Sequence, residues 1–92
     1  MDVQDKVEIN VLYFAAASTA TGLSQETISV PLNLPLSRLG NILVARHPKA
    51  TDLSKILDGS QWSVDEEMVD EPETVELKGG EEVAIICPVS GG

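Results

Sequence analysis

Val83-Ala84-Ile85-Ile86-Cys87 is an unbroken apolar run close to the C-terminus of this chain, and Pro88-Val89-Ser90-Gly91-Gly92 follows it directly. A short apolar run without alternation is typical of a strand that is buried on both faces. We therefore expect 83–87 to form a central strand of a sheet. Glycine has no Cβ and adopts backbone angles that other residues avoid, so we expect 88–92 to be an extended, flexible tail.

The first part of the chain carries two more strand patterns. Apolar and polar residues alternate through 7–13 and again through 26–30, up to Pro31, which is the pattern of half-buried strands. The stretch 16–25, around Gly22, is small and polar and has the composition of a loop. Two strands joined by this loop predict a hairpin.

The middle of the chain has the apolar spacing of a helix over 35–46. The positions that recur at this spacing are Leu36, Leu39, Ile42 and Leu43. Pro35 suits a first helical turn, and Asn33 is a candidate cap. His47-Pro48 should end the helix, because a residue before proline avoids the α conformation.

The second half of the chain contributes shorter segments. Their expected order is a helical turn over 53–57 capped by Asp52, a strand over 61–64, a short strand over 68–69, a surface crossing over 70–76 and a glycine turn over 78–82.

The order strand, strand, helix, strand, short strand, strand predicts the fold class. It is an α+β fold in which a mixed sheet of about four to five strands is crossed by one main helix, the β-grasp arrangement of ubiquitin-like proteins. A chain of 92 residues has room for one small core. We therefore expect residues 1–92 to form a single domain that ends in the tail.

Composition restricts the partners. Fifteen acidic and six basic residues give a formal net charge of −9, which repels nucleic acid and anionic membrane surfaces and favours a partner with a basic face. The one cysteine, Cys87, allows neither an internal disulfide nor a cysteine metal cage. No apolar run approaches the length of a membrane span or a signal core. We expect a soluble, untargeted protein of the cytosol that binds neither nucleic acid nor membrane.

The side chains offer few candidates for catalysis. No glycine loop is followed by Lys-Ser or Lys-Thr, so the chain has no phosphate cradle, and Gly79-Gly80 is interpreted as a turn. His47 is interpreted as a cap at the helix end, and Asp65-Glu66-Glu67 as a solvated turn whose carboxylates point apart. Cys87 is expected to fill space in the core. No catalytic side chain and no metal site are predicted.

The group left to react is the C-terminal carboxylate of Gly92. A carboxylate is a poor electrophile until one oxygen becomes part of a better leaving group, and adenylation achieves this. A sulfur or nitrogen nucleophile can then attack, which gives either a thiocarboxylate carrier or an isopeptide modifier. Because the chain has no phosphate cradle, a partner must supply the nucleotide site.

Several segments give the chain a resemblance to a known family. They are Val11-Leu12-Tyr13-Phe14-Ala15, Glu26-Thr27-Ile28-Ser29-Val30-Pro31, Arg46-His47-Pro48, Gly80-Glu81-Glu82-Val83-Ala84 and the terminal Pro88-Val89-Ser90-Gly91-Gly92. In these segments, which span nearly its whole length, the chain resembles the small subunits of molybdopterin synthases, which are ubiquitin-like sulfur carriers. It resembles the eukaryotic branch most closely.

The resemblance implies a reaction at Gly92. An activating enzyme would consume ATP to form a transient glycyl adenylate, and a sulfurtransferase system would turn it into a C-terminal thiocarboxylate, 1-thioglycine. Pro88, Val89, Ser90 and Gly91 would thread into the large subunit, where the sulfur passes to a cyclic pyranopterin phosphate. The resemblance also implies a heterotetramer of two small and two large subunits, with the catalytic side chains on the large one and no cofactor bound stably to this chain.

Some assignments stay open at this point. Phe14 and Val89 are candidate contacts with the large subunit or the activating enzyme, although Phe14 could equally pack in the core. The chain departs from the family in three places: it has no basic residue within 16–20, Cys87 stands where proline is usual, and Met68 replaces an aromatic residue. The alternative function is a ubiquitin-like protein modifier or a sulfur carrier for tRNA or thiamine thiolation, because these share the fold and the Gly-Gly end.

Overall fold

The computed structural model describes residues 5–87 of the chain. The expected tail, 88–92, lies outside this range, and so do the candidate residues Pro88, Val89, Ser90, Gly91 and Gly92.

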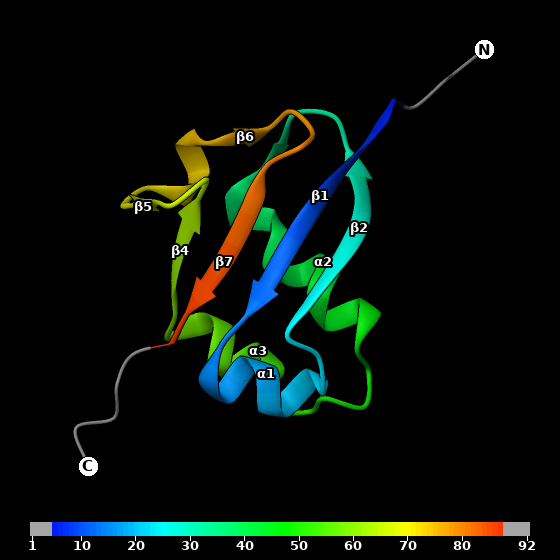
Figure 1. Ribbon diagram of the computed structural model, residues 1–92, viewed down its shortest axis with the longest axis vertical. Helices are drawn as coiled ribbons and strands as arrows, with labels where there is room; N and C mark the ends of the chain where they lie inside the picture. Colours follow the sequence, from blue (N-terminus) through cyan, green and yellow to red (C-terminus); the bar gives the residue numbers. More distant parts are fainter. Residues whose placement is uncertain (1–4, 88–92) are drawn as a thin grey trace.

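The elements follow one another in an order close to the predicted one (Figure 1). They are β1 (Lys6–Tyr13), α1 (Ala15–Thr21), β2 (Gln25–Pro31), β3 (Leu34–Pro35), the 3₁₀ turn η1 (Leu36–Arg38), α2 (Leu39–Arg46), α3 (Leu53–Asp58), β4 (Gln61–Val64), β5 (Glu67–Val69), the 3₁₀ turn η2 (Pro72–Thr74), β6 (Glu76–Leu77) and β7 (Glu82–Ile86).

Within residues 5–87, five strands form one mixed sheet in the order β2-β1-β7-β4-β5, and β3 and β6 form a small separate ladder. β7 runs parallel to β1, and the other neighbours in the large sheet are antiparallel. Val83, Ala84 and Ile85 are all buried in β7, so the prediction of a central strand is confirmed, although the strand itself ends at Ile86. In Figure 1, α2 lies behind this sheet, and α1 and α3 lie below the ends of its strands. The predicted α+β, β-grasp fold is confirmed.

The core lies between the helices and the sheet. In β1 every second residue, Ile9, Val11 and Tyr13, is buried, as the alternating sequence predicts. From α2, Leu39 and Leu43 are fully buried, because residues four apart lie on the same side of a helix. Truncation of either leucine to alanine is expected to cost about 2–5 kcal/mol of unfolding free energy.

The prediction of a loop over 16–25 is wrong, because 15–21 form α1. Alanine is the strongest helix former, and it supplies four of the seven residues of α1. Gly22 ends the helix in the left-handed conformation, with φ 76°, and its N–H donates to Ser18 O at 2.8 Å. Alanines have too little apolar surface to give a helical pattern, and Ala17 alone among the residues of α1 is buried. β1 and β2 do pair antiparallel, as expected of a hairpin, but a helix connects them.

The prediction of one helix starting at Pro35 is also wrong in its first turn. Pro35 belongs to β3 and pairs with Glu76, and the chain then makes the 3₁₀ turn η1 before α2 begins. Asn33 is not a helix cap: it sits in a turn with φ 66°, and its Oδ1 accepts a hydrogen bond from Lys78 Nζ at 2.7 Å. Asp52 does precede α3, but its side chain makes no capping hydrogen bond.

The two predicted turns are confirmed, but each is one residue shorter than predicted, because Glu67 belongs to β5 and Glu82 to β7. Asp65 and Glu66 connect β4 to β5 with positive φ angles of 51° and 74°, which is typical of the tight turns of hairpins. The carboxylate of Asp65 also accepts the N–H of Glu82 at 3.0 Å. Gly79 and Gly80 both have positive φ, at 112° and 85°, so the glycine turn before β7 has a conformation that other residues adopt with strain.

Candidate functional site

The parallel strands β1 and β7 finish at the same edge of the sheet, where Tyr13 is in register with Ile85. We call this edge the exit end, because β7 leaves the sheet there towards the C-terminus. The residue after β1 is Phe14, whose side chain is 48% exposed. This exposure does not fit the interpretation that Phe14 packs in the core.

Cys87 also lies at the exit end, and the prediction that it fills space in the core is confirmed in part, because its side chain packs against the edge of the core. The strand ends one residue earlier, so Cys87 is only half-buried. Its thiol donates to Phe14 O at 3.3 Å, and Ser60 Oγ lies 3.8 Å from its sulfur. Cys87 therefore links the end of β7 to the end of β1.

A polar cluster supports the same end of β1 from inside the molecule. The carboxylate of Glu26 in β2 is its centre, and three side chains donate to it. The donor-to-oxygen distances are 2.5 Å from Tyr13 Oη, 2.6 Å from His47 Nε2 and 3.0 Å from Arg46 Nε. The Glu26 side chain is only 12% exposed. This cluster, called the Glu26 cluster below, ties β1 and β2 to the C-terminal end of α2.

The contacts within the Glu26 cluster shift the pKa values of Glu26 and Tyr13. Burial of Glu26 disfavours its charged form, but the hydrogen bonds from Tyr13, His47 and Arg46 outweigh this and hold the pKa of Glu26 below its ordinary value. Burial, together with the Glu26 carboxylate, raises the pKa of the Tyr13 hydroxyl well above its ordinary range. Glu26 is therefore an acceptor and Tyr13 a donor at neutral pH.

The prediction that His47 caps the end of α2 is confirmed. The backbone N–H of His47 donates to Leu43 O and Val44 O and so closes the helix. Its ring binds Glu26 and packs edge-on against Tyr13, with ring centroids 6.0 Å apart. No local sequence pattern indicates this contact, because Glu26 and His47 are 21 positions apart.

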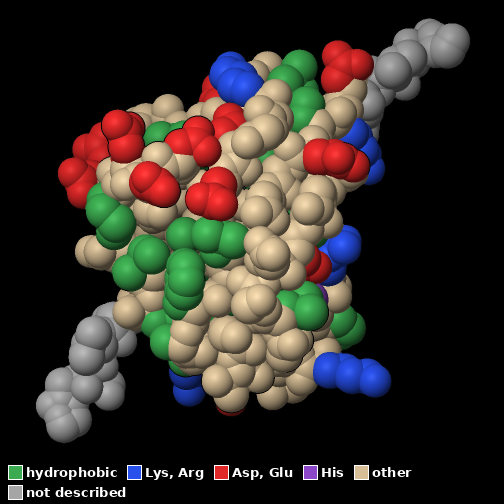
Figure 2. Space-filling view, in the orientation of Figure 1, with side chains coloured by type: hydrophobic (Ala, Val, Ile, Leu, Met, Phe, Trp, Pro, Cys, Tyr) green, Lys and Arg blue, Asp and Glu red, His purple; other side chains and the backbone are tan. Residues whose placement is uncertain are grey.

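The other face of the sheet, which no helix covers in Figure 1, is the open face. Its middle row runs across the strands through residues in register: Leu12, Ala84, Ser63 and Met68. Met68 is 53% exposed. Figure 2 shows hydrophobic side chains gathered over β4 and β7, with acidic side chains above them. The open face thus offers an apolar surface that reaches towards the exit end.

Further observations concern metals and membranes. Among residues 5–87, no three His, Cys, Asp or Glu side chains come together in a way that could hold a metal ion. Nor does any helix in this part of the chain have the length and apolar character needed to cross a membrane.

Sequence comparisons relate this chain to known proteins. A model of the ThiS family matches residues 11–92. A protein named molybdopterin synthase sulfur carrier subunit, from Mycosarcoma maydis, is 44% identical over 87 residues that cover 91% of this chain and 92% of that protein. The Homo sapiens protein of the same name is 35% identical over 86 residues, which cover 92% of this chain and 94% of that protein.

One solved structure shows the fold alone. The crystal structure of SAMP1 from Haloferax volcanii has a TM-score of 0.74 at 23% identity, and the match covers 92% of this chain and 99% of that one. The family match includes the exit end and continues to Gly92, beyond the described residues. On these matches, the chain belongs to the ThiS family.

Proposed function

We propose that this chain is the sulfur carrier subunit of a molybdopterin synthase, and that Gly92 carries the sulfur. The observation that supports this most strongly is the similarity to named sulfur carrier subunits, at 44% and 35% identity over about nine-tenths of the chain. The family model also extends to the terminal glycine.

The chemistry starts at the Gly92 carboxylate. On an activating enzyme, one of its oxygens attacks the α-phosphorus of ATP, and pyrophosphate leaves. Sulfide-level sulfur (HS⁻) from the sulfurtransferase system then attacks the carbonyl carbon of the glycyl adenylate, AMP leaves, and loss of the thioacid proton gives the thiocarboxylate. ATP is consumed, and no cofactor stays on the chain.

The thiocarboxylate then donates its sulfur to a cyclic pyranopterin phosphate on the large subunit, and two loaded carriers serve one dithiolene. In this scheme the chain is the donor, and the catalytic side chains belong to the large subunit. We place these steps in the cytosol, since a chain with one cysteine needs no oxidising compartment.

The fold supplies a firm base for such a tail. β7 is paired with β1 on one side and with β4 on the other. The Cys87 thiol contact to Phe14 O and the Glu26 cluster hold the neighbouring strand end. The residues that follow Cys87 therefore start from a fixed point, which reduces the conformational entropy lost when a partner binds them.

The exposed apolar residues support a docking surface for the large subunit. Phe14 lies at the exit end and Met68 on the open face, and both are about half exposed. An aromatic side chain is a typical anchor of a protein interface. We assign Phe14 and the apolar part of the open face to contact with the large subunit, in a heterotetramer of two small and two large subunits.

The experiment is a reconstituted sulfur transfer. The full chain is incubated with the activating enzyme, ATP and a sulfur donor, then with the large subunit and cyclic pyranopterin phosphate, and molybdopterin is measured. A chain that lacks Gly92 is the control: it should produce no molybdopterin, yet unfold at the same urea concentration as the full chain.

Full activity without Gly92 would contradict the proposed function. Attachment of the chain to lysines of other proteins, in place of molybdopterin formation, would instead support the protein-modifier alternative.

A further inference from the structure

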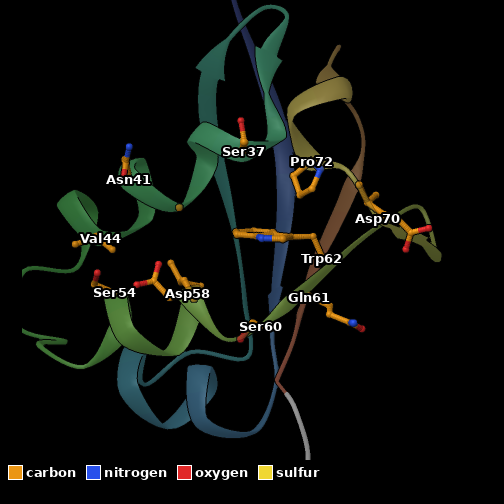
Figure 3. Close-up of a pocket in the computed structure, with 13 residues that line it drawn as sticks. Ser37, Asn41, Val44, Ser54, Asp58, Ser60, Gln61, Trp62, Asp70 and Pro72 are labelled. Carbon is orange, nitrogen blue, oxygen red and sulfur yellow. The ribbon is translucent and has the colours of Figure 1, made fainter.

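A groove lies between the helices and the β4–β5 edge of the sheet, and the function proposed above gives it no role. Its volume is about 440 Å³, and residues of α2, α3, β4, β5 and the two 3₁₀ turns line it. In Figure 3 the indole ring of Trp62 lies across the middle of the groove, with Ser37 and Pro72 on one side of the ring and Asp58 and Ser60 on the other.

The charged residues that line this groove are acidic. Asp58, which ends α3, and Asp70, which follows β5, are the charged residues that line it. A second hollow of about 560 Å³ adjoins it and shares Val69 and Asp70. The acidic residues that this second hollow adds are Asp65, Glu67 and Glu71. Within the described chain no lysine or arginine lines either hollow, and we call the two together the acidic track.

Trp62 has an unused hydrogen-bond donor. The residue is only 8% exposed, and the part that is exposed lines the groove. No hydrogen bond joins its indole Nε1–H to another atom of residues 5–87, and this nitrogen is not sealed from solvent. A largely buried indole N–H usually finds an acceptor. The groove therefore has room and a donor for an acceptor oxygen that residues 5–87 do not provide.

We propose that the acidic track binds a basic, arginine-bearing segment of a protein partner. A polypeptide brings both groups that the groove lacks: a backbone carbonyl oxygen to accept from Trp62 Nε1–H, and a guanidinium to pair with Asp58 or Asp70. A guanidinium also stacks favourably on an indole ring. The net charge of −9 attracts such a segment from a distance, and it repels nucleotides and acidic lipid headgroups.

The Trp62 groove is separate from the surface assigned to the large subunit, whereas the second hollow reaches Met68 at the border of the open face. The groove lies on the side of β4 where Trp62 packs under the helices, whereas Ser63 and Met68 face the opposite side. A partner in the Trp62 groove therefore leaves Phe14 and the centre of the open face free. The inference does not depend on the chemistry of Gly92, so either proposal can fail without the other.

The test is a peptide titration of the full chain. The probe is the capped peptide acetyl-Gly-Arg-Gly-Arg-Gly-amide, and the matched control peptide carries citrulline, which has the same shape without the charge, at both arginine positions. Trp62 is the only tryptophan, so its fluorescence and the NMR signal of its indole N–H report directly on the groove. The arginine peptide should shift both signals, and the citrulline peptide should bind at least tenfold more weakly.

Charge variants locate the binding site. Asp58→Asn and Asp70→Asn should each weaken the arginine peptide roughly two- to fivefold, the effect of one exposed ion pair. Asp52→Asn removes the same charge from a residue outside the groove and should leave the affinity unchanged. Equal binding of the citrulline peptide would overturn the proposal. So would equal weakening by Asp52→Asn, or NMR shifts confined to the open face.

Discussion

Replacement of Glu26 by alanine is predicted to remove a large part of the stability of this domain. The change deletes the acceptor of three side chains. Tyr13 is 2% exposed, and its hydroxyl would lose its partner in the interior, at a cost of about 1–3 kcal/mol. The bond from His47 to a charged oxygen contributes about 1.5–3 kcal/mol more. Arg46 is 49% exposed, and its ion pair adds at most about 1 kcal/mol.

The terms share one carboxylate and do not add fully, so the expected loss is about 3–5 kcal/mol. Domains of this kind have unfolding free energies of about 5–15 kcal/mol. The assay is urea unfolding of the full chain, followed by the fluorescence of Trp62. The matched control is Glu8→Ala: Glu8 is an exposed glutamate of β1, and its loss should change stability by no more than about 0.5 kcal/mol.

A double-mutant cycle tests the cause. In Tyr13→Phe there is no hydroxyl to leave unpaired, so Glu26→Ala should cost about 1–2 kcal/mol less in that background than in the parent. Strict additivity of the two changes, or a loss below about 1 kcal/mol for Glu26→Ala alone, would refute the reasoning.

Three further predictions follow from particular residues. Because the pKa of Glu26 is lowered in the folded state, its stabilisation is present above about pH 4.3 and is lost as the pH falls through the folded pKa; urea midpoints should drop less steeply in acid for Glu26→Gln. Gly79→Ala should destabilise at least about 1 kcal/mol more than Gly80→Ala. Both positions have positive φ, but a Cβ added at Gly79 would lie 2.9 Å from Val7 Cβ, whereas a Cβ added at Gly80 would meet no atom within 4 Å. Equal urea midpoints for the two variants would contradict the predicted difference. Phe14→Ser should change stability by less than about 1 kcal/mol yet weaken binding to the large subunit, measured by calorimetry.

The sequence predicted the sheet better than the helices. An apolar run such as 83–87 and the alternation of 7–13 reflect burial by the sheet itself, so β7 and β1 could be located from local pattern. α1 could not, because it is built from small residues and buries almost nothing. The first turn of the main helix was misplaced because Pro35 suits both a first helical turn and the strand β3 that it occupies.

The parts of the candidate site that depend on chain order could be predicted from the sequence. The parts that depend on tertiary contacts could not. The exit end follows from β7 being the last strand, and Phe14 was singled out from its segment. The Glu26 cluster joins residues 13 to 21 positions apart, and Trp62 lines its groove together with α2 and α3. Neither the Glu26 cluster nor the Trp62 groove has a regular sequence spacing from which it could be predicted.

The most direct test of the sulfur carrier function is the intact mass of the full chain after incubation with its activating enzyme, ATP and a sulfur donor. The predicted result is a mass gain equal to the replacement of one oxygen by sulfur, located at Gly92 by fragmentation and retained in Cys87→Ser. Addition of a sulfur atom without loss of oxygen, located at Cys87 and absent from Cys87→Ser, would contradict the account.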